Sequence, residues 1–369
     1  MPIAILYSEK LREYDFGPGH SFRGDRYEVF PRFLREKLSG ESYRILGAAP
    51  ATNEDLLKVC KKDYIEFTQA YFRAANSGVY YNGNFHHFHS GDNRPIGTPG
   101  KLEEAARFIV GQAKLAADLI QQGQFKKVVS IGGGMHHAKE SYGEGFCIYN
   151  DVAYAARYLL DTYRLEKILI LDTDAHAGNG TCEYFYSDPR VLFIDLHQDP
   201  MTLYPGTGFI DEIGMDSGKG FTINVPVPVY AGYDSYRFVF DELIHPIAEE
   251  FKPQIIIRNG GSDPHFADGL TQLGLPLKGF RMIGEQIREI SGICDGKVVD
   301  LIASGYNERV LPYAWLALIA GLADIKIPTE ELESIPSRFE TDQSLGATKE
   351  VLGQIKRNLS DYWACLSRS

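Results

Sequence analysis

The sequence has few cysteines, and they follow no regular spacing. The five of them are scattered along the chain and form no CxxC pair: Cys60, Cys147, Cys182, Cys294 and Cys365. An odd number of scattered cysteines argues against a disulfide framework and is typical of reduced thiols in a cytoplasm. We therefore expect a cytoplasmic protein.

Long apolar runs are also lacking. No stretch approaches the ~18 consecutive apolar residues that a membrane-spanning helix needs. Residues 1–7 turn polar too early to form a secretory signal. We therefore expect a soluble protein that has no membrane partner.

The chain has fewer basic than acidic residues. The chain has 38 lysines and arginines against 49 acidic residues, which gives a net charge of −11. This balance argues against direct nucleic-acid binding and is compatible with a cationic substrate. The glycine clusters at 17–19 and 132–134 lack the GxxxxGK[ST] and GxGxxG spacings, so they do not indicate phosphate binding.

The remainder of the composition is that of a globular protein, with 369 residues, 44% of them hydrophobic. From residue 127 onward, strand and helix patterns alternate. Such alternation predicts a three-layer αβα fold whose mostly parallel central sheet carries helices on both faces. No repeat, low-complexity tract or convincing linker precedes residue 325. We expect one catalytic domain over 1–369, with the 330–369 tail packed on it.

One motif stands at the centre of the chain. Residues 168–171 form an apolar run, and the polar sequence Asp172-Thr-Asp174-Ala-His176 follows it directly. Extended chain repeats every two residues, so these three side chains would point the same way. Carboxylates and an imidazole at the carboxyl end of a buried strand suit zinc. For an isolated motif of this kind, a merely structural turn is the more common explanation.

Three further strands end in glycine-rich turns that carry polar residues: His136-His137, Asp263 and Tyr306. In open parallel sheets, sites lie beyond the carboxyl ends of the strands. Asp174, His176 and Asp263 supply the three ligands of a catalytic zinc site. The histidine pair is then available for proton transfer, and the Tyr306 hydroxyl for an oxyanion.

Together these motifs resemble the histone deacetylase and acetylpolyamine amidohydrolase family, in its prokaryotic form, over roughly residues 3–325. Gly132-Gly-Gly-Met-His-His-Ala-Lys, followed by Gly145-Phe-Cys-Ile-Tyr-Asn-Asp151, is similar to the family's tandem-histidine motif. Residues 172–180 are similar to its D-x-D-x-H-x-G-[DN]-G motif. Residues 204–208, 261–263 with 268–270, and 305–306 match the rest in order. The resemblance implies the arginase–deacetylase fold.

The resemblance also implies roles for individual residues. Asp174, His176 and Asp263 would bind zinc or iron, His136 and His137 would form the general acid/base pair, and Tyr306 would polarise the amide carbonyl. Asp172 and Asn179 would orient the histidines, and a structural potassium ion would lie near Asp172, Asp195 and Leu196. Phe146, Tyr204 and Leu270 would line a narrow acyl channel, in which Gly145 leaves room for the substrate chain.

The chain departs from the family pattern at several positions. Ala177 replaces a second histidine, and Asp195 replaces the serine often found at the potassium site. The rim position often held by a substrate-gripping aspartate is Asn93, preceded by Asp92. Arg26 resembles the arginine of the family's product channel, or it forms only an ion pair at a helix start.

Two other features compete with this interpretation. His86, His87 and His89 lie in a long loop over 77–99, where they could form a second metal site, a rim or an interface. Cys147, Cys182, His197 and His265 lie near the motifs, and structural roles are the more common ones for them. A two-manganese ureohydrolase is the nearest rival enzyme, but Gly178 and His265 stand where it would need carboxylates. A non-catalytic protein that binds acyl groups or polyamines is the other rival.

We therefore predict a metal-dependent amidohydrolase, a hydrolase of linear amides, that removes acetyl or a related short acyl group from an amine. The amine would belong to an acyl-lysine of a protein or peptide, or to an acylated polyamine. The sequence leaves the oligomeric state open, a homo-oligomer included.

Overall fold

A computed structural model describes residues 2–80 and 83–367 of the chain. Tyr81 and Asn82, which belong to the loop predicted over 77–99, lie outside the described residues, as do the ends of the predicted domain at 1 and 368–369. The described chain divides into two compact units. The N-terminal unit comprises Met1–Arg164 with Val299–Ala303, and the C-terminal unit comprises Leu165–Val298 with Ser304–Ser369.

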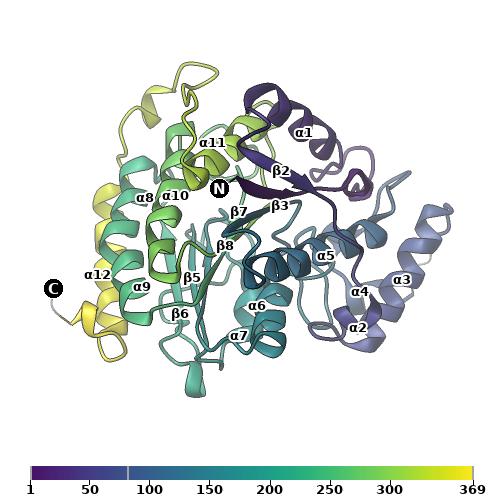
Figure 1. Ribbon diagram of the computed structural model, residues 1–369, viewed down its shortest axis with the longest axis horizontal. Coiled ribbons are helices and arrows are strands. Elements are labelled where there is room, and N and C mark those ends of the chain that lie inside the picture. Colours follow the sequence, from purple (N-terminus) through teal and green to yellow (C-terminus); the bar gives the residue numbers. More distant parts are fainter. Residues whose placement is uncertain (1, 81–82, 368–369) are drawn as a thin grey trace. The chain divides into compact units, whose positions relative to one another are not determined.

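The strands belong to one eight-stranded sheet flanked by helices, which confirms the predicted fold class (Figure 1). The strand order is β2-β1-β3-β8-β7-β4-β5-β6. The pairs β1–β2, β1–β3, β4–β5, β4–β7 and β5–β6 are parallel. Their carboxyl ends therefore meet at one edge within each unit, which is the edge where sites form in such folds.

Four strands of mostly apolar sequence lie in the N-terminal unit, apart from Val298 at the start of the last of them. They are β1 (Ile3–Leu6), β2 (Tyr43–Leu46), β3 (Lys127–Ile131) and β8 (Val298–Ile302). The helices are α1 (Arg26–Lys37), α2 (Asn53–Leu56), α3 (Lys62–Asn76), α4 (Phe85–Phe88), α5 (Leu102–Gln121) and α6 (Asp151–Thr162), with short 3-10 turns at Glu9–Glu13 and Gly91–Asn93. Helix α5 packs on β3 and α6 because its alanines, leucines and isoleucines gather on its buried side.

In the C-terminal unit, the strands are β4 (Ile168–Asp172), β5 (Val191–Gln198), β6 (Thr222–Val227) and β7 (Ile255–Gly260). The helices are α7 (Asn179–Phe185), α8 (Tyr233–Val239), α9 (His245–Phe251), α10 (Leu277–Ile290), α11 (Leu311–Ala323) and α12 (Leu345–Leu359). A π-helical turn, Phe240–Ile244, joins α8 to α9, and 3-10 turns lie at Asp216–Gly218, Ser291–Cys294, Ser337–Phe339 and Ala364–Leu366.

Strand β4 is buried at every residue, as its apolar sequence predicts. Its neighbours β5 and β7 place Asp195 and Asn259 in register with Asp172, so three polar side chains follow the apolar runs at one level of the sheet.

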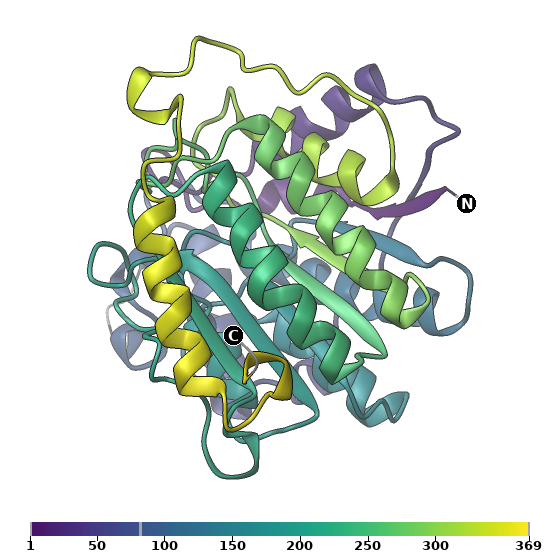
Figure 2. The same cartoon turned by 90° about the vertical axis from the view of Figure 1, so that its left-hand side faces the viewer.

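The C-terminal tail packs on the C-terminal unit. Helix α12 lies against β6 and α8, and Figure 2 shows it running beside the green helices α8 and α9. Among the described residues, no helix combines the length and the apolar composition that a membrane span would require.

Candidate metal centre and histidine pair

The turn after β4 is built by hydrogen bonds among its own polar residues. The Asp172 carboxylate accepts the Asp174 N–H at 3.1 Å, and its other oxygen accepts Asn259 Nδ2 at 2.9 Å. The Asp174 carboxylate in turn accepts the His176 N–H at 2.9 Å. Each carboxylate therefore fixes the backbone two residues further on, which is the usual behaviour of aspartate in turns.

Asp174, His176 and Asp263 converge on one point in the C-terminal unit. Their potential ligand atoms all lie within 4.8 Å of one another. The His176 Nδ1 atom lies 3.1 Å from Asp174 Oδ1 and 3.0 Å from Asp263 Oδ2. Both aspartates are buried, and the His176 side chain is 12% exposed. Two carboxylate oxygens and an imidazole nitrogen at this spacing are a donor set that suits zinc or iron.

The electrostatics of this group favour a cation. Burial and the negative charge of Asp174 raise the pKa of Asp263 to about 8. Burial by itself lowers the pKa of His176, but hydrogen bonds to both carboxylates outweigh it and raise the pKa to about 10. Two carboxylates buried against each other repel unless a positive charge lies between them or one of them is protonated. In the metal-free state, protons on His176 and Asp263 reduce this repulsion.

Asp263 is held by neighbours that the motif alone does not reveal. Ser304 Oγ donates to Asp263 Oδ1 at 2.6 Å, and the Ala175 N–H donates to Oδ2 at 3.3 Å. Both carboxylate oxygens are thus oriented, which is how surrounding residues fix metal ligands.

Tyr306 lies beside the metal-ligand candidates. Its ring centroid is 6.4 Å from that of His176, in an edge-to-face arrangement. Its backbone N–H donates to Asp268 Oδ2 at 2.7 Å, so Asp268 sets the position of the tyrosine turn. The sequence places Asp268 in a segment, 268–270, that matches the family motif, but its role in holding the tyrosine turn is visible only in the structure.

The two histidines lie together in the N-terminal unit, in the turn that follows β3. Their ring centroids are 4.1 Å apart, and their exposed fractions are 3% and 4% for His136 and His137. The structure therefore groups the predicted site residues into two sets, one in each unit.

Two side chains at the start of α6 form hydrogen bonds with the backbone of the histidine turn. Asp151 accepts the N–H groups of Gly134, at 3.0 Å, and Met135, at 2.7 Å. Asn150, the N-cap of α6, donates to the carbonyls of His136 and Ala138 at 3.3 and 2.9 Å. In the sequence, these two residues stand out only as part of the segment 145–151. Their positioning role becomes visible only when the helix start and the turn meet.

Gly145 lies directly against the His137 ring. A Cβ atom on it would lie 2.2 Å from Cδ2 of His137, and its φ is +59°. The space beside Gly145 is thus taken by the His137 ring, and any larger residue would displace that ring. Whether the substrate chain also passes here remains a prediction.

The other predicted site residues are spread over the two units. Phe146 is half-buried in the N-terminal unit, and Tyr204 and Leu270 are exposed in the C-terminal unit at 43% and 40%. Asn179 begins α7. Asn93 is fully buried, and Asp92 is partly exposed.

At the predicted potassium position, the Asp195 carboxylate contacts other groups of the protein. Asp195 Oδ2 accepts the Gly178 N–H at 2.8 Å, and Oδ1 lies 3.0 Å from His197 Nδ1. Leu196 is buried beside it. Because His197 Nε2 also contacts the Gly208 carbonyl at 3.0 Å, His197 is a buried strand histidine with two partners.

Several competing residues have structural roles. His89 is fully buried, its Nε2 lies 3.0 Å from Thr68 Oγ1, and burial lowers its pKa to about 3. His265 Nε2 contacts Glu331 at 3.1 Å. Burial raises the pKa of Cys182. Arg26 donates to the carbonyls of Arg23 and Ala303 at 2.9 Å each.

In the described part of the chain, one group of three or more His, Cys, Asp or Glu side chains could hold a metal ion, and it consists of Asp174, His176 and Asp263.

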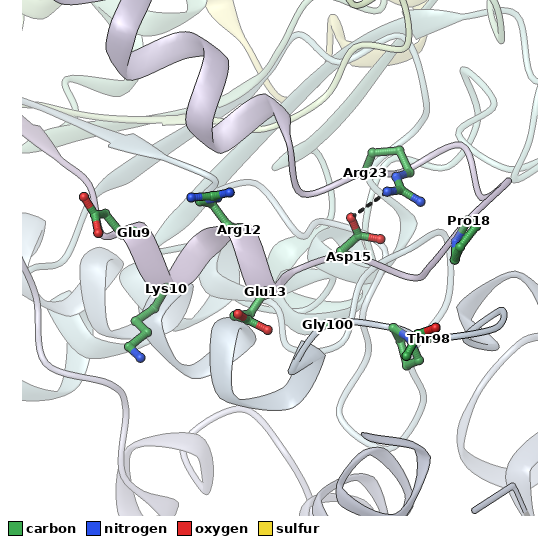
Figure 3. A pocket seen from close by; sticks show the side chains of 10 residues that line it. Glu9, Lys10, Arg12, Glu13, Asp15, Pro18, Arg23, Thr98 and Gly100 are labelled. Atoms are coloured by element: carbon green, nitrogen blue, oxygen red, sulfur yellow. Dashed lines mark ion pairs between the residues drawn. The ribbon is translucent and has the colours of Figure 1, made fainter. Parts of the chain in front are cut away.

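The N-terminal unit also has a cavity of about 590 Å³, which Figure 3 shows. None of the predicted site residues lines it. Its charged residues are of both signs, and the Arg23–Asp15 pair spans 3.3 Å. The Asp15 carboxylate also accepts the Gly17 and Gly24 N–H groups, so it is occupied by the loop itself.

Known proteins that resemble this chain belong to the family that its sequence motifs indicate. The Histone deacetylase domain family matches residues 20–322. A probable deacetylase of Archaeoglobus fulgidus is 35% identical, over 99% of both chains. The acetoin utilization protein AcuC of Staphylococcus aureus (strain COL) is 34% identical, over 87% of this chain and 82% of its own. AcuC of Staphylococcus xylosus is 31% identical, over 91% and 86%.

Proposed function

Because the chain belongs to the histone deacetylase domain family, we propose that it is a metal-dependent deacylase. It would remove acetyl or a related short acyl group from an amine by hydrolysis of the amide bond. The observation that carries this proposal is the buried Asp174–His176–Asp263 group with Tyr306 beside it.

The donor set fits the metal that the family implies. The two carboxylates and the imidazole offer three ligands and leave further positions open, as catalytic zinc sites do. The raised pKa values of His176 and Asp263 indicate a site in which a divalent cation would replace the proton. Among the described residues the group has three members, and Gly178 and His265 stand where a two-metal ureohydrolase would need further carboxylates, which favours one metal.

A bound zinc or iron ion would act as a Lewis acid that polarises the amide carbonyl and acidifies water. In the proposed reaction, Tyr306 donates its hydroxyl proton in a hydrogen bond to the carbonyl oxygen, which strengthens as negative charge develops there. His136 and His137 take a proton from the attacking water and deliver it to the leaving amine.

Further roles rest on the family resemblance. Asp172 and Asn179 would orient the histidines, and Phe146, Tyr204 and Leu270 would line the acyl channel. Asp172, Asp195 and Leu196 would hold potassium, although Asp195 already contacts Gly178 and His197. The substrate would be an acyl-lysine or an acylated polyamine, and the cytoplasm would be the place of action.

The test uses purified protein that has been stripped with a chelator and reloaded with zinc or iron. It is assayed on matched acyl-lysine peptides and acylated polyamines. We expect turnover to need the metal and Tyr306→Phe to lower kcat by about 10²-fold or more, with metal content unchanged. Turnover that survives chelation would refute the proposal. Full metal loading without turnover on any acyl substrate would favour the non-catalytic binding protein.

A further inference from the structure

The turn formed by residues 90–93, here called the rim latch, is fastened to the segment 143–147 that carries Phe146. Backbone hydrogen bonds join Gly143 to Ser90 and to Phe88, which lies just before the turn. The Ser90 N–H donates to the Gly143 carbonyl at 2.9 Å, and the Gly143 N–H donates to the Phe88 carbonyl at 2.9 Å. Both segments belong to the N-terminal unit.

The Asp92 carboxylate is directed inward, toward this segment. Its Oδ2 accepts the Gly145 N–H at 3.0 Å, and its Oδ1 accepts a hydrogen bond from the Ser90 hydroxyl. Both oxygens of the carboxylate therefore have donors within the protein.

The neighbouring Asn93 is engaged in the same way. It is fully buried, and its Nδ2 donates to the Cys147 carbonyl at 2.8 Å. The Tyr14 hydroxyl donates to the Phe146 carbonyl at 2.7 Å. Three successive residues, Gly145 to Cys147, are thus tied by side chains from elsewhere in the unit.

Phe146 needs this support because its backbone is unfavourable. Its φ is +65°, a left-handed conformation that a bulky residue rarely adopts. Such a conformation persists only when neighbouring contacts impose it. Removing one of those contacts should therefore let the segment relax and the ring move.

His20 connects the latch to the Phe146 ring. Its ring meets that of Phe146 edge-to-face at 4.8 Å and stacks on Phe16 at 4.5 Å. Its Nδ1 accepts the Phe22 N–H at 3.0 Å, which assigns the proton to Nε2, and Nε2 donates to the Asp92 carbonyl at 2.9 Å. The backbone of Asp92 and the side chain of Phe146 are therefore held by the same imidazole.

We propose that Asp92 is a positioning residue that acts through Gly145 to fix Phe146, and that it does not grip the backbone of a peptide substrate. This inference rests on the proposed function, in which Phe146 lines the acyl channel. Substrate selection at this rim would then act on the acyl group, and peptides and small amines would be treated alike.

The test compares Asp92→Ala and Asp92→Asn with the wild type. The control is Glu140→Gln, which removes an acidic charge from an exposed ion pair with Lys61. The substrates are an acetyl-lysine peptide and an acetylated diamine, each also in butyryl form. We expect Asp92→Ala to lower kcat by about tenfold or more on both amines, with KM little changed, and to reduce the preference between acyl lengths.

Asp92→Asn keeps an acceptor for the Gly145 N–H and should restore kcat to within about threefold of the wild type. A loss confined to the peptide and expressed in KM would overturn the proposal, because it would show a grip on the peptide backbone. Equal loss in both variants would overturn it as well, because the charge and not the hydrogen bond would then matter.

Hydrogen exchange provides a readout that does not depend on activity. The amides of residues 143–147 should exchange faster in Asp92→Ala than in the wild type, and Asp92→Asn and Glu140→Gln should not differ from the wild type. Unchanged exchange in Asp92→Ala would overturn the latch even if the enzyme is active. If exchange changes as expected while the wild type hydrolyses no acyl substrate, the proposed function fails and the latch stands.

Discussion

At the scale of residues, the chemistry of the candidate metal centre is set by close charges. His176 Nδ1 lies between two buried carboxylates, which raise the pKa of His176. Burial and the negative charge of Asp174 raise the pKa of Asp263, although the contact with His176 lowers it. A metal ion needs a neutral imidazole and ionised carboxylates. The site must therefore release protons when it is loaded.

Metal affinity should consequently increase with pH. The pKa of His176 is about 10 and that of Asp263 about 8 in the metal-free protein, so at neutral pH both groups hold protons that the metal displaces. We expect the affinity for zinc to rise steadily between about pH 6 and 8. Competition with a chromophoric chelator measures the affinity, and calorimetry in buffers of different ionisation enthalpy counts the protons. An affinity that is independent of pH would contradict this assignment, and His176→Ala supplies the metal-free control.

At the scale of elements, the start of α6 is the clearest case of a helix end that positions another segment. Asn150 caps the helix by accepting the Ala153 N–H at 2.8 Å and at the same time holds the histidine turn. Asp151 adds two backbone hydrogen bonds to that turn while it is fully buried. The helix terminus thus supports the predicted acid/base pair.

The burial of Asp151 should appear in the pH dependence of stability. Burial raises its pKa from 3.8 to about 6, against the backbone hydrogen bonds, so the folded protein holds this proton more tightly than the unfolded chain. The resulting stabilisation is complete below about pH 4 and is lost as the pH rises through about 6. Relative to Asp151→Asn, the wild type should lose up to about 3 kcal/mol of unfolding free energy between these limits.

Urea unfolding at several pH values measures this difference. The exposed Asp161→Asn serves as the matched control, since it changes the same chemical group on the same helix. Parallel stability curves for the wild type and Asp151→Asn would show that burial does not perturb Asp151.

At the scale of the whole molecule, the segment beyond the family match is part of the C-terminal unit. The family match ends at residue 322, and the chain continues through α12 to residue 367 in the structure. Asp342 accepts the N–H groups of Gly232 and Ser235 at 2.9 and 2.7 Å, which ties the tail to the start of α8. Glu331 contacts His265, two residues after Asp263, at 3.1 Å.

The tail should therefore contribute to global stability through Trp363. This side chain is 5% exposed, packs against Phe221 and Phe251, and donates to the Gly220 carbonyl at 2.8 Å. We expect Trp363→Ala to cost about 3–5 kcal/mol in the free energy of unfolding. Leu332→Ala, at a tail residue that is 38% exposed, should stay within about 0.5 kcal/mol. If urea unfolding showed the same change in unfolding free energy for Trp363→Ala as for Leu332→Ala, the tail would not be part of the cooperative unit.

The sequence by itself determined the fold class and the donor set of the candidate metal centre. Buried parallel strands have a continuous apolar sequence, so the strand at 168–171 and its polar end could be recognised directly. The sequence pattern does not by itself identify the strand at 222–227 or the helices at 277–290 and 311–323. Short apolar runs do not distinguish strand from helix, and propensity leaves their assignment to packing.

Only the tertiary structure decided how side chains distant in sequence support the predicted groups. Asp151 meets Gly134, Ser304 meets Asp263, and Asp92 meets Gly145 across loops whose pairing no local pattern encodes. The same reason explains the burial of Asn93, which no local sequence pattern predicts. Spacing along a strand is fixed by local geometry, whereas these contacts depend on how loops are brought together by the packed core.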